Sequence, residues 1–265
     1  MADDIIAVKN LIKRFDGRTV LDGITLRIPT GKITVIMGGS GCGKSTFLRH
    51  LIGLLQPDEG EISIEGKNIV GVDEKQLNDA RRTFGMLFQG AALFNSMSVG
   101  ENVALPLKEH TDLSQEIINI IVKVKLELVG LTGFEKFMPY QISGGMKKRV
   151  ALARAIALDP RIVFYDEPGA GLDPITASMI DQLILDLSQK LKITSVVVTH
   201  EMKSAFRIAD QIIILHKGKV LEVGTPEMIK NSKNSYVHQF INGEPEGVIP
   251  LKQTSDAYLK GLLET

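Results

Sequence analysis

A predicted strand, a glycine-rich loop and a predicted helix follow one another near the start of the chain, and this order limits the possible folds more than any other feature. Residues 33–37 form an apolar run that predicts a buried strand. Residues 38–45 read Gly-Gly-Ser-Gly-Cys-Gly-Lys-Ser and fit the phosphate-binding pattern G-x-x-x-x-G-K-[ST]. Residues 46–52 then have helical spacing. The sequence therefore predicts an α/β core with a phosphate site at a helix N-terminus.

The loop contains the residue types that a nucleotide triphosphate needs. Its glycines let backbone N–H groups converge on the phosphates, while Lys44 offers a positive charge and Ser45 a hydroxyl for Mg²⁺. The alternative, a glycine-rich turn that binds nothing, is disfavoured by the preceding strand and the complete Gly-Lys-Ser ending. Cys42 is interpreted as a small tolerated side chain, although a helix N-terminus could make it reactive. The candidate nucleotide-binding residues here are Gly38, Gly39, Ser40, Gly41, Cys42, Gly43, Lys44, Ser45 and Thr46.

Two later strands end in polar side chains. Residues 162–165 lead to Asp166 and Glu167, at the strand end where open α/β sheets bind ligands. Asp166 is placed to hold Mg²⁺ through water, and Glu167 to polarise the attacking water. His200 follows residues 194–198 and could reach the γ-phosphate. Adjacent acids are often only a solvated strand end, and a lone histidine is more often structural. The phosphate loop favours the functional interpretation of all three.

A second glycine-rich segment, Ser143-Gly144-Gly145, precedes a predicted helix. Such a helix start attracts anions, and its place in a separate lobe makes the γ-phosphate of a facing subunit the fitting ligand. The alternative is an ordinary capped helix. Lys147, Lys148 and Arg149 follow, and we interpret them as a solvated helix face in preference to a nucleic-acid contact.

The pattern of predicted elements indicates the fold class. Short alternating stretches in residues 5–64 predict an antiparallel sheet, and residues 90–158 have helical character. Apolar strands return at residues 162–165, 194–198 and 211–215, which suits a parallel sheet covered on both faces. We therefore predict an α/β phosphate-loop core with an N-terminal antiparallel β subdomain and a helical subdomain inserted at about residues 90–158. This domain is expected to span residues 5–241, and residues 242–265 to form an extension.

Composition restricts the partners and the compartment. Lys plus Arg and Asp plus Glu both number 31, so the chain has no net positive charge to attract nucleic acid or acidic lipid. The single cysteine excludes an internal disulfide, and the first residues do not have the pattern of a secretory signal. We expect a cytoplasmic protein, and any membrane-spanning helices to belong to another subunit.

The ordered motifs resemble those of the ATP-binding cassette ATPases over residues 5–241. Residues 38–45 look like their Walker A loop, Ser143 to Lys147 like their signature, and Asp166-Glu167 like the end of their Walker B motif. The resemblance implies ATP and Mg²⁺ as cofactors and catalytic roles for Lys44, Glu167 and His200. Two residues depart from the family pattern: Met146 stands where glutamine is usual, and Gly39 where proline is frequent.

Further roles follow from the resemblance alone. It implies that Gln89 contacts the nucleotide. It also implies that Ser45, Gln89 and Asp166 are the ligands of the metal ion. Residues 171–174 look like the D-loop, which makes Asp173 a nucleotide-site residue. Phe15 stands where the family places an aromatic ring that stacks on adenine, although simple core packing is an alternative.

A narrower resemblance concerns the substrate. Residues 87–94, the run Pro-Leu-Lys-Glu-His at 106–110, and Met146 are similar to the Mla and Mce-type lipid-transport ATPases. This similarity implies an ATPase that moves phospholipids between the inner and outer membranes and maintains outer-membrane lipid asymmetry. It also implies a peripheral position on the cytoplasmic face of the inner membrane.

The partners that this branch implies are a second copy of the chain, a homodimeric MlaE-like permease, an Mce-domain lipid-binding subunit like MlaD, and a STAS-domain protein like MlaB. Residues after about 242 could grip the opposite ATPase, or be disordered. The alternative functions are an ATPase for uptake of amino acids, ions or metals, or a DNA-repair cassette ATPase. The second alternative is disfavoured because residues 89–143 contain no long coiled-coil insertion.

Overall fold

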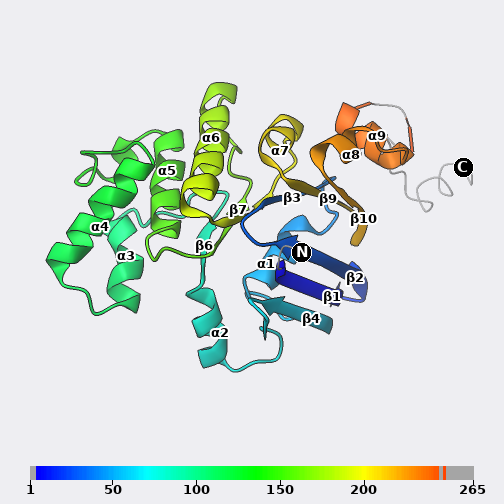
Figure 1. Ribbon diagram of the computed structural model, residues 1–265, viewed down its shortest axis with the longest axis horizontal. Helices are drawn as coiled ribbons and strands as arrows, with labels where there is room; N and C mark the ends of the chain where they lie inside the picture. The colour runs from blue at the N-terminus through cyan, green and yellow to red at the C-terminus, as the bar shows by residue number, and fades with distance from the viewer. Residues whose placement is uncertain (1–3, 245–246, 249–265) are drawn as a thin grey trace, which may run out of the picture.

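The computed structural model describes residues 4–244 and 247–248. In this part of the chain the strands form two sheets, and a lobe of helices lies at one end of the molecule (Figure 1). None of the helices in the described residues has the length and apolar character that a bilayer crossing requires.

A six-stranded sheet in the order β10-β9-β3-β8-β7-β6 forms the centre. Its strands are β3 (Ile33–Gly38), β6 (Phe84–Leu87), β7 (Ile162–Asp166), β8 (Thr194–Val198), β9 (Gln211–His216) and β10 (Lys219–Gly224). Five of them pair in parallel, and the apolar runs predict four of these, whereas β6 was not predicted. The edge strand β10 is antiparallel to β9 and was not predicted. Lys217 and Gly218 turn the chain between them with positive φ angles of 46° and 77°, as a tight hairpin requires.

The parallel pairing decides where the functional residues meet. Ile36 of β3 and Asp166 of β7 both pair with Val198 of β8. The loop after β3, the carboxylates at the end of β7 and the residues after β8 therefore share one edge of the sheet, where ligands bind in open α/β folds.

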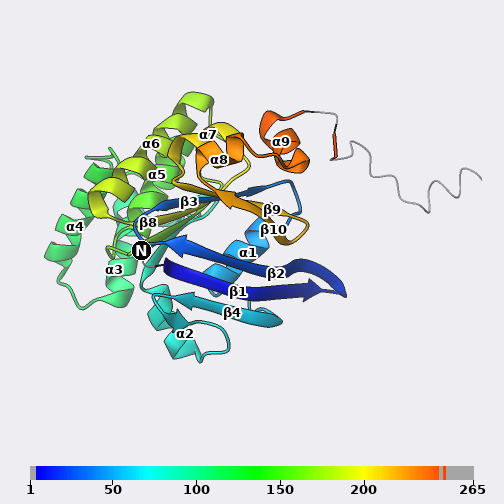
Figure 2. The same ribbon diagram turned by 45° about the vertical axis from the view of Figure 1, so that its right-hand side comes forward.

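A four-stranded antiparallel sheet, in the order β2-β1-β4-β5, covers one side of this centre (Figure 2). Its strands are β1 (Asp4–Phe15), β2 (Arg18–Pro29), β4 (Glu59–Ile64) and β5 (Lys67–Asn68). Helix α1 (Lys44–Leu51) joins the two sheets, because Phe47, Leu48 and Leu51 are buried in one cluster with residues of both. Ile36 points into this cluster, whereas its neighbours Val35 and Met37 point to the opposite face, as alternation along a strand dictates.

Helices cover the opposite face of the six-stranded sheet and form the lobe. They are α3 (Val99–His110), α4 (Gln115–Leu128), the 3₁₀ helix η1 (Pro139–Gln141), α5 (Gly144–Ala155), α6 (Pro174–Leu191), α7 (Met202–Ile208), α8 (Pro226–Lys230) and α9 (Ser235–Asn242). Ser98, Ser114 and Ser143 cap α3, α4 and α5 through their side chains. These three helices lie within the segment 90–158 that was expected to be helical.

Two short helices were not predicted from the sequence. Helix α2 (Glu74–Arg81) buries Leu77 and has a capping box formed by Asp73 and Gln76. Helix α9 begins at the cap residue Asn234. The expected extension at residues 242–265 lies mainly outside the described residues.

Candidate nucleotide-binding site

The glycine loop is built so that only glycine fits at its two ends. Gly38 has a φ of 154°, and a Cβ there would lie 2.2 Å from the Leu215 carbonyl oxygen. Gly43 has a φ of 104°, and its Cβ would lie 2.7 Å from the Leu21 side chain. The backbone can therefore turn tightly between β3 and α1, which leaves the N–H groups at the helix start available for an anion.

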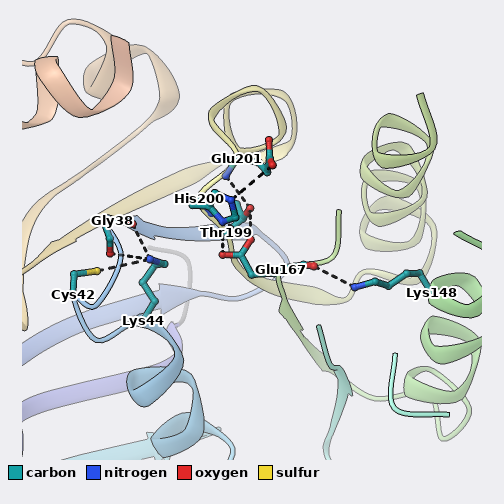
Figure 3. Close-up of polar contacts among 9 residues, drawn as sticks. Gly38, Cys42, Lys44, Lys148, Glu167, Thr199, His200 and Glu201 are labelled. Atoms are coloured by element: carbon teal, nitrogen blue, oxygen red, sulfur yellow. Dashed lines mark hydrogen bonds and ion pairs between the residues drawn. The ribbon is translucent and has the colours of Figure 1, made fainter. Parts of the chain in front are cut away.

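Lys44 lies across its own loop. Its ammonium group donates to the carbonyl oxygens of Gly38 at 2.7 Å and Gly39 at 3.1 Å (Figure 3). The buried Cys42 thiol is 4.0 Å away, and burial raises the pKa of that thiol although Lys44 acts in the opposite direction, which disfavours a reactive thiolate. The structure thus supports the interpretation of Cys42 as a small tolerated side chain.

A hollow of about 670 Å³ opens in front of this loop. Phe15, at the end of β1, lines it together with Arg18, Gly41, Lys44 and Thr46. The Phe15 ring is 42% exposed, so it is not a core residue, and the packing alternative is wrong. An aromatic ring beside a phosphate loop is suitably placed to stack on a purine base.

Glu167 is the most constrained residue at the sheet edge. Its φ of 47° places a non-glycine residue in the left-handed region, which costs about 1–2 kcal/mol. Its N–H donates to the Val198 carbonyl at 2.8 Å, and its own carbonyl accepts from the Ala170 N–H at 3.1 Å. Strain that the surroundings maintain is typical of functional positions.

The Glu167 carboxylate is held by the residues that follow β8 (Figure 3). The Thr199 hydroxyl donates to it at 3.1 Å, and the His200 backbone N–H at 3.4 Å. His200 Nδ1 lies 2.8 Å from the second carboxylate oxygen, and the His200 side chain is 61% exposed. The sequence pattern had placed Glu167 and His200 at one edge, and the structure brings them into direct contact. Thr199 was missed, although its position between β8 and His200 was a signal.

Asp166 lies beside Glu167 and is half-buried. Burial and the neighbouring Glu167 charge raise the pKa of Asp166, while Arg49, Lys148 and Lys44 act in the opposite direction. A carboxylate that is poorly solvated and close to another acid gains from a cation placed beside it. Ser45, exposed at the start of α1, and Gln89, two residues after β6, add neutral oxygen donors at the same edge of the sheet.

This donor set fits Mg²⁺. The described residues contain no group of three or more His, Cys, Asp or Glu side chains that could hold a metal by themselves. Mg²⁺ usually takes one or two protein carboxylates together with phosphate oxygens and water, so a hydroxyl, an amide and a single carboxylate suit it.

The second glycine segment begins α5. Ser143 caps this helix by accepting the Met146 N–H at 3.3 Å, and both Ser143 and Gly144 are exposed. Gly145 packs against α6, because a Cβ there would lie 2.4 Å from the Thr176 side chain. Helices α5 and α1 lie well apart in both ribbon views (Figures 1 and 2). The helix that Ser143 caps therefore does not lie beside the helix that follows the phosphate loop of the same chain.

Asp173 has a clear structural role at the start of α6. Its carboxylate accepts the N–H groups of Ile175 and Thr176, both at 3.0 Å, and the Thr176 hydroxyl at 2.5 Å. The Thr176 hydrogen bonds lower the pKa of Asp173, so it stays ionised at neutral pH. This cap fixes the loop before α6, which is exposed at Gly171 and Asp173.

One of the three cations after the signature does not match the expectation of a solvated face. Lys148 is only 5% exposed, and its ammonium group donates to the backbone carbonyls of Gln89 and Glu167. The interpretation of Lys148 as a solvated residue is therefore wrong. The face of α5 that bears Lys148 also bears the buried residues Gly145 and Leu152, at helical spacing, and this periodicity was the signal available in the sequence.

His50 on α1 makes the stability of this region sensitive to pH. Its ring is 1% exposed, with Nδ1 lying 2.7 Å from the Thr46 carbonyl oxygen. Burial lowers the pKa of His50 and outweighs the hydrogen bond with the Thr46 carbonyl, which raises it; nearby Lys13 lowers the pKa further. The unfolded chain therefore binds a proton that the folded chain resists. The folded state therefore has its full stability, as far as His50 is concerned, above the unfolded pKa of about 6.5. The free energy of unfolding decreases as the pH falls below that value.

We expect the thermal unfolding temperature to fall between pH 7 and pH 5.5, and His50→Gln to make this decline shallower. A single proton contributes at most about 1.4 kcal/mol per pH unit to the slope. Calorimetric scans of both proteins across this range measure the difference. Equal slopes would show that His50 is not responsible.

Comparisons with known proteins agree with this geometry. Residues 21–170 match the family described as ABC transporter. The intermembrane phospholipid transport system ATP-binding protein MlaF of Haemophilus influenzae is 43% identical over 264 residues, which cover all of both chains. The probable ribonucleotide transport ATP-binding protein mkl of Mycobacterium tuberculosis is also 43% identical, over 95% of this chain and 70% of its own length.

Among solved structures, a dimeric ATP-binding cassette in a post-hydrolysis state with ADP and Pi superposes with a TM-score of 0.77. It is 34% identical, and the alignment covers 83% of this chain and 98% of that one. These matches confirm the predicted α/β phosphate-loop fold class.

Proposed function

We propose that this chain, which belongs to the ABC transporter family, is the ATP-hydrolysing subunit of a complex that moves phospholipids between the inner and outer membranes and maintains outer-membrane lipid asymmetry. The chain is an ABC ATPase. The observation that carries the lipid assignment is the match to the phospholipid-transport protein MlaF, which covers the full length of both chains. The match to mkl has the same sequence identity, which makes ribonucleotide a candidate cargo. It ranks second because 30% of the mkl protein is not covered by the match.

Two copies of the chain would complete each ATP site. Ser143 and Gly144 are exposed at the start of α5, a helix that lies apart from α1 of its own chain. The N–H groups at this helix start favour an anion, and the γ-phosphate bound by a second copy supplies one. The post-hydrolysis structure that superposes on this chain is a dimer, which supports the arrangement.

Each chain then supplies the remaining contacts. The Phe15 ring stacks on adenine, the loop from Gly38 to Thr46 binds the phosphates, and Lys44 leaves its carbonyl partners for the β- and γ-phosphates. Ser45, Gln89 and Asp166 hold Mg²⁺, which when bound neutralises charge on the phosphate oxygens. Asp173 orders the loop that faces the second copy.

Glu167 acts on the attacking water. Its carboxylate is fixed on two sides by Thr199 and His200, so it can accept a water proton without first reorganising. The His200 side chain is 61% exposed, so its Nε2 can contact the γ-phosphate while Nδ1 stays beside Glu167. Hydrolysis removes the γ-phosphate, and with it the link that joins the two copies.

The permease would contact a groove of about 640 Å³ beside β6, the outermost strand of the six-stranded sheet next to the helical lobe. Phe88 and Phe94 line it and are 38% and 50% exposed, and Arg82 and Arg154 add positive charge. The segment 88–94 also contains Gln89. A permease helix bound in this groove would therefore move when Gln89 changes position at the nucleotide site. The permease, an Mce-domain lipid-binding subunit and a STAS-domain protein would place the chain peripherally on the cytoplasmic face of the inner membrane.

Affinity purification of the tagged chain from native membranes tests this assignment. We expect a permease and an Mce-domain protein in stoichiometric amounts, together with bound phospholipid. The purified complex in vesicles should then move labelled phospholipid in an ATP-dependent manner, with the Glu167→Gln complex as the inactive control. Copurification of an amino-acid or metal permease, or ATP-dependent movement of labelled ribonucleotide only, would contradict the lipid assignment.

A further inference from the structure

Lys148 is a buried cation between the helical lobe and the catalytic edge of the sheet. It lies on α5, which begins at Ser143, and its side chain reaches across to the sheet edge (Figure 3). The ammonium group donates to the Gln89 carbonyl oxygen and, at 3.3 Å, to the Glu167 carbonyl oxygen. One side chain therefore joins three segments: the helix with the candidate signature, the loop after β6, and the end of β7.

Helix packing alone does not require a lysine at this position. Taking an ammonium group out of water is unfavourable, and burial lowers the pKa of Lys148 despite the attraction of Asp166 and Glu167. A residue such as methionine would fill the same space without this penalty. What the lysine adds is a hydrogen-bond donor to two backbone carbonyl groups, those of Gln89 and Glu167.

Both carbonyls belong to segments with unfavourable backbone conformations. Glu167 has a φ of 47°, and Ala91 and Ala92, just after Gln89, have φ values of 62° and 50°. Arg154, also on α5, donates to the Ala91 and Ala92 carbonyls at 2.9 and 2.8 Å. Helix α5 thus holds the Gln89 loop at two points, and only Lys148 extends the contact to Glu167.

We propose that Lys148 is a positioning residue that links the backbones of Gln89 and Glu167 to the signature helix, so that the placement of both for hydrolysis depends on the position of α5. When a second copy of the chain closes on the nucleotide, a shift of α5 is transmitted to the Glu167 carbonyl through this side chain. The inference rests on the proposed roles of Gln89 and Glu167.

The test uses Lys148→Met in the full chain, with Lys125→Met as a matched control. Lys125 is also 5% exposed and in the same lobe, but it pairs with Asp159 at 2.5 Å, away from the nucleotide edge. We expect Lys148→Met to lower kcat for ATP about 10- to 100-fold, with KM within about twofold, because small misplacements of catalytic groups have effects of this size. Lys125→Met should lower the thermal unfolding temperature and leave kcat within about twofold.

A second readout is independent of turnover. The Ala170 N–H shares the Glu167 carbonyl with Lys148, and the Ala91 N–H donates to the Phe88 carbonyl and closes the turn that contains Gln89. In Lys148→Met we expect hydrogen exchange at these two amides to become about threefold to tenfold faster, since a stabilising hydrogen bond beside each is lost. Lys148→Arg keeps the charge and the donors, so it should restore kcat to within about threefold of the original chain.

Equal kcat values and equal exchange rates for Lys148→Met and Lys125→Met would overturn the proposal. If Lys148→Met does not fold, Lys148→Gln serves in the same comparison, with an expected kcat about 3- to 10-fold below the original. Failure of the proposed catalytic roles can be distinguished from failure of the Lys148 proposal. An active Glu167→Gln variant would reject the catalytic roles, whereas the hydrogen-exchange experiment would still test whether Lys148 holds the Gln89 and Glu167 backbones.

Discussion

Replacing Glu167 with glutamine is expected to lower the rate of ATP hydrolysis about 100- to 1000-fold while ATP binding is retained. Glutamine has nearly the same shape, and its carbonyl oxygen can still accept the Thr199 hydroxyl and the His200 N–H. What the amide cannot do is accept a proton from water. Steady-state phosphate release measures the loss of turnover, and isothermal titration calorimetry with ATP measures the retained affinity.

Glu201→Gln is the matched control for this experiment. Glu201 also lies near His200, with 3.9 Å between its carboxylate and Nε2, but its side chain is 55% exposed. Its amide variant should keep kcat within about threefold. Substantial hydrolysis by Glu167→Gln, or an equal loss in Glu201→Gln, would remove Glu167 as the residue that polarises the water.

Lys44→Ala is expected to reduce kcat/KM for ATP about 100- to 1000-fold, the usual effect of removing one preorganised charge donor from a reacting phosphate or oxyanion. Unlike the Glu167 variant, it should also weaken ATP binding, because the proposed role of the ammonium group is to contact the nucleotide before and during reaction. Calorimetry and phosphate release on the same preparation separate the two effects.

The control for Lys44 is Lys32→Ala at the opposite end of β3. Lys32 is 53% exposed and pairs with Asp210 at 3.3 Å, far along the strand from the loop. Removing it should leave both affinity and turnover within about twofold. Unchanged affinity and turnover in Lys44→Ala would contradict the assignment of the phosphate loop.

Local patterns in the sequence predicted the elements that carry the chemistry. The apolar run before Gly38 and the strands leading to Asp166 and His200 lie where the periodicity placed them, since a buried parallel strand is an uninterrupted apolar run. That Glu167 and His200 touch follows from β3, β8 and β7 being neighbours in the sheet. Strand order is a tertiary property, so the local hydrophobic pattern could not predict the contact between Glu167 and His200.

The residues that escaped prediction depend on tertiary packing. Lys148 is a cation in a run of three, and which of the three is buried depends on how α5 is rotated against the sheet. Phe15 had two interpretations, and its exposure in the folded chain, beside the hollow, separates them. Helix α9 is eight residues long, and sequences of that length specify a helix weakly without packing partners.

The central claim is that one chain holds only half of each ATP site. The most direct measurement is a structure of the Glu167→Gln variant with ATP and Mg²⁺, in which slow hydrolysis preserves the bound triphosphate. The account predicts two copies, with the γ-phosphate bound by the loop from Gly38 to Ser45 of one copy and by Ser143 to Gly145 of the other. A triphosphate fully enclosed by a single unpaired chain would contradict it.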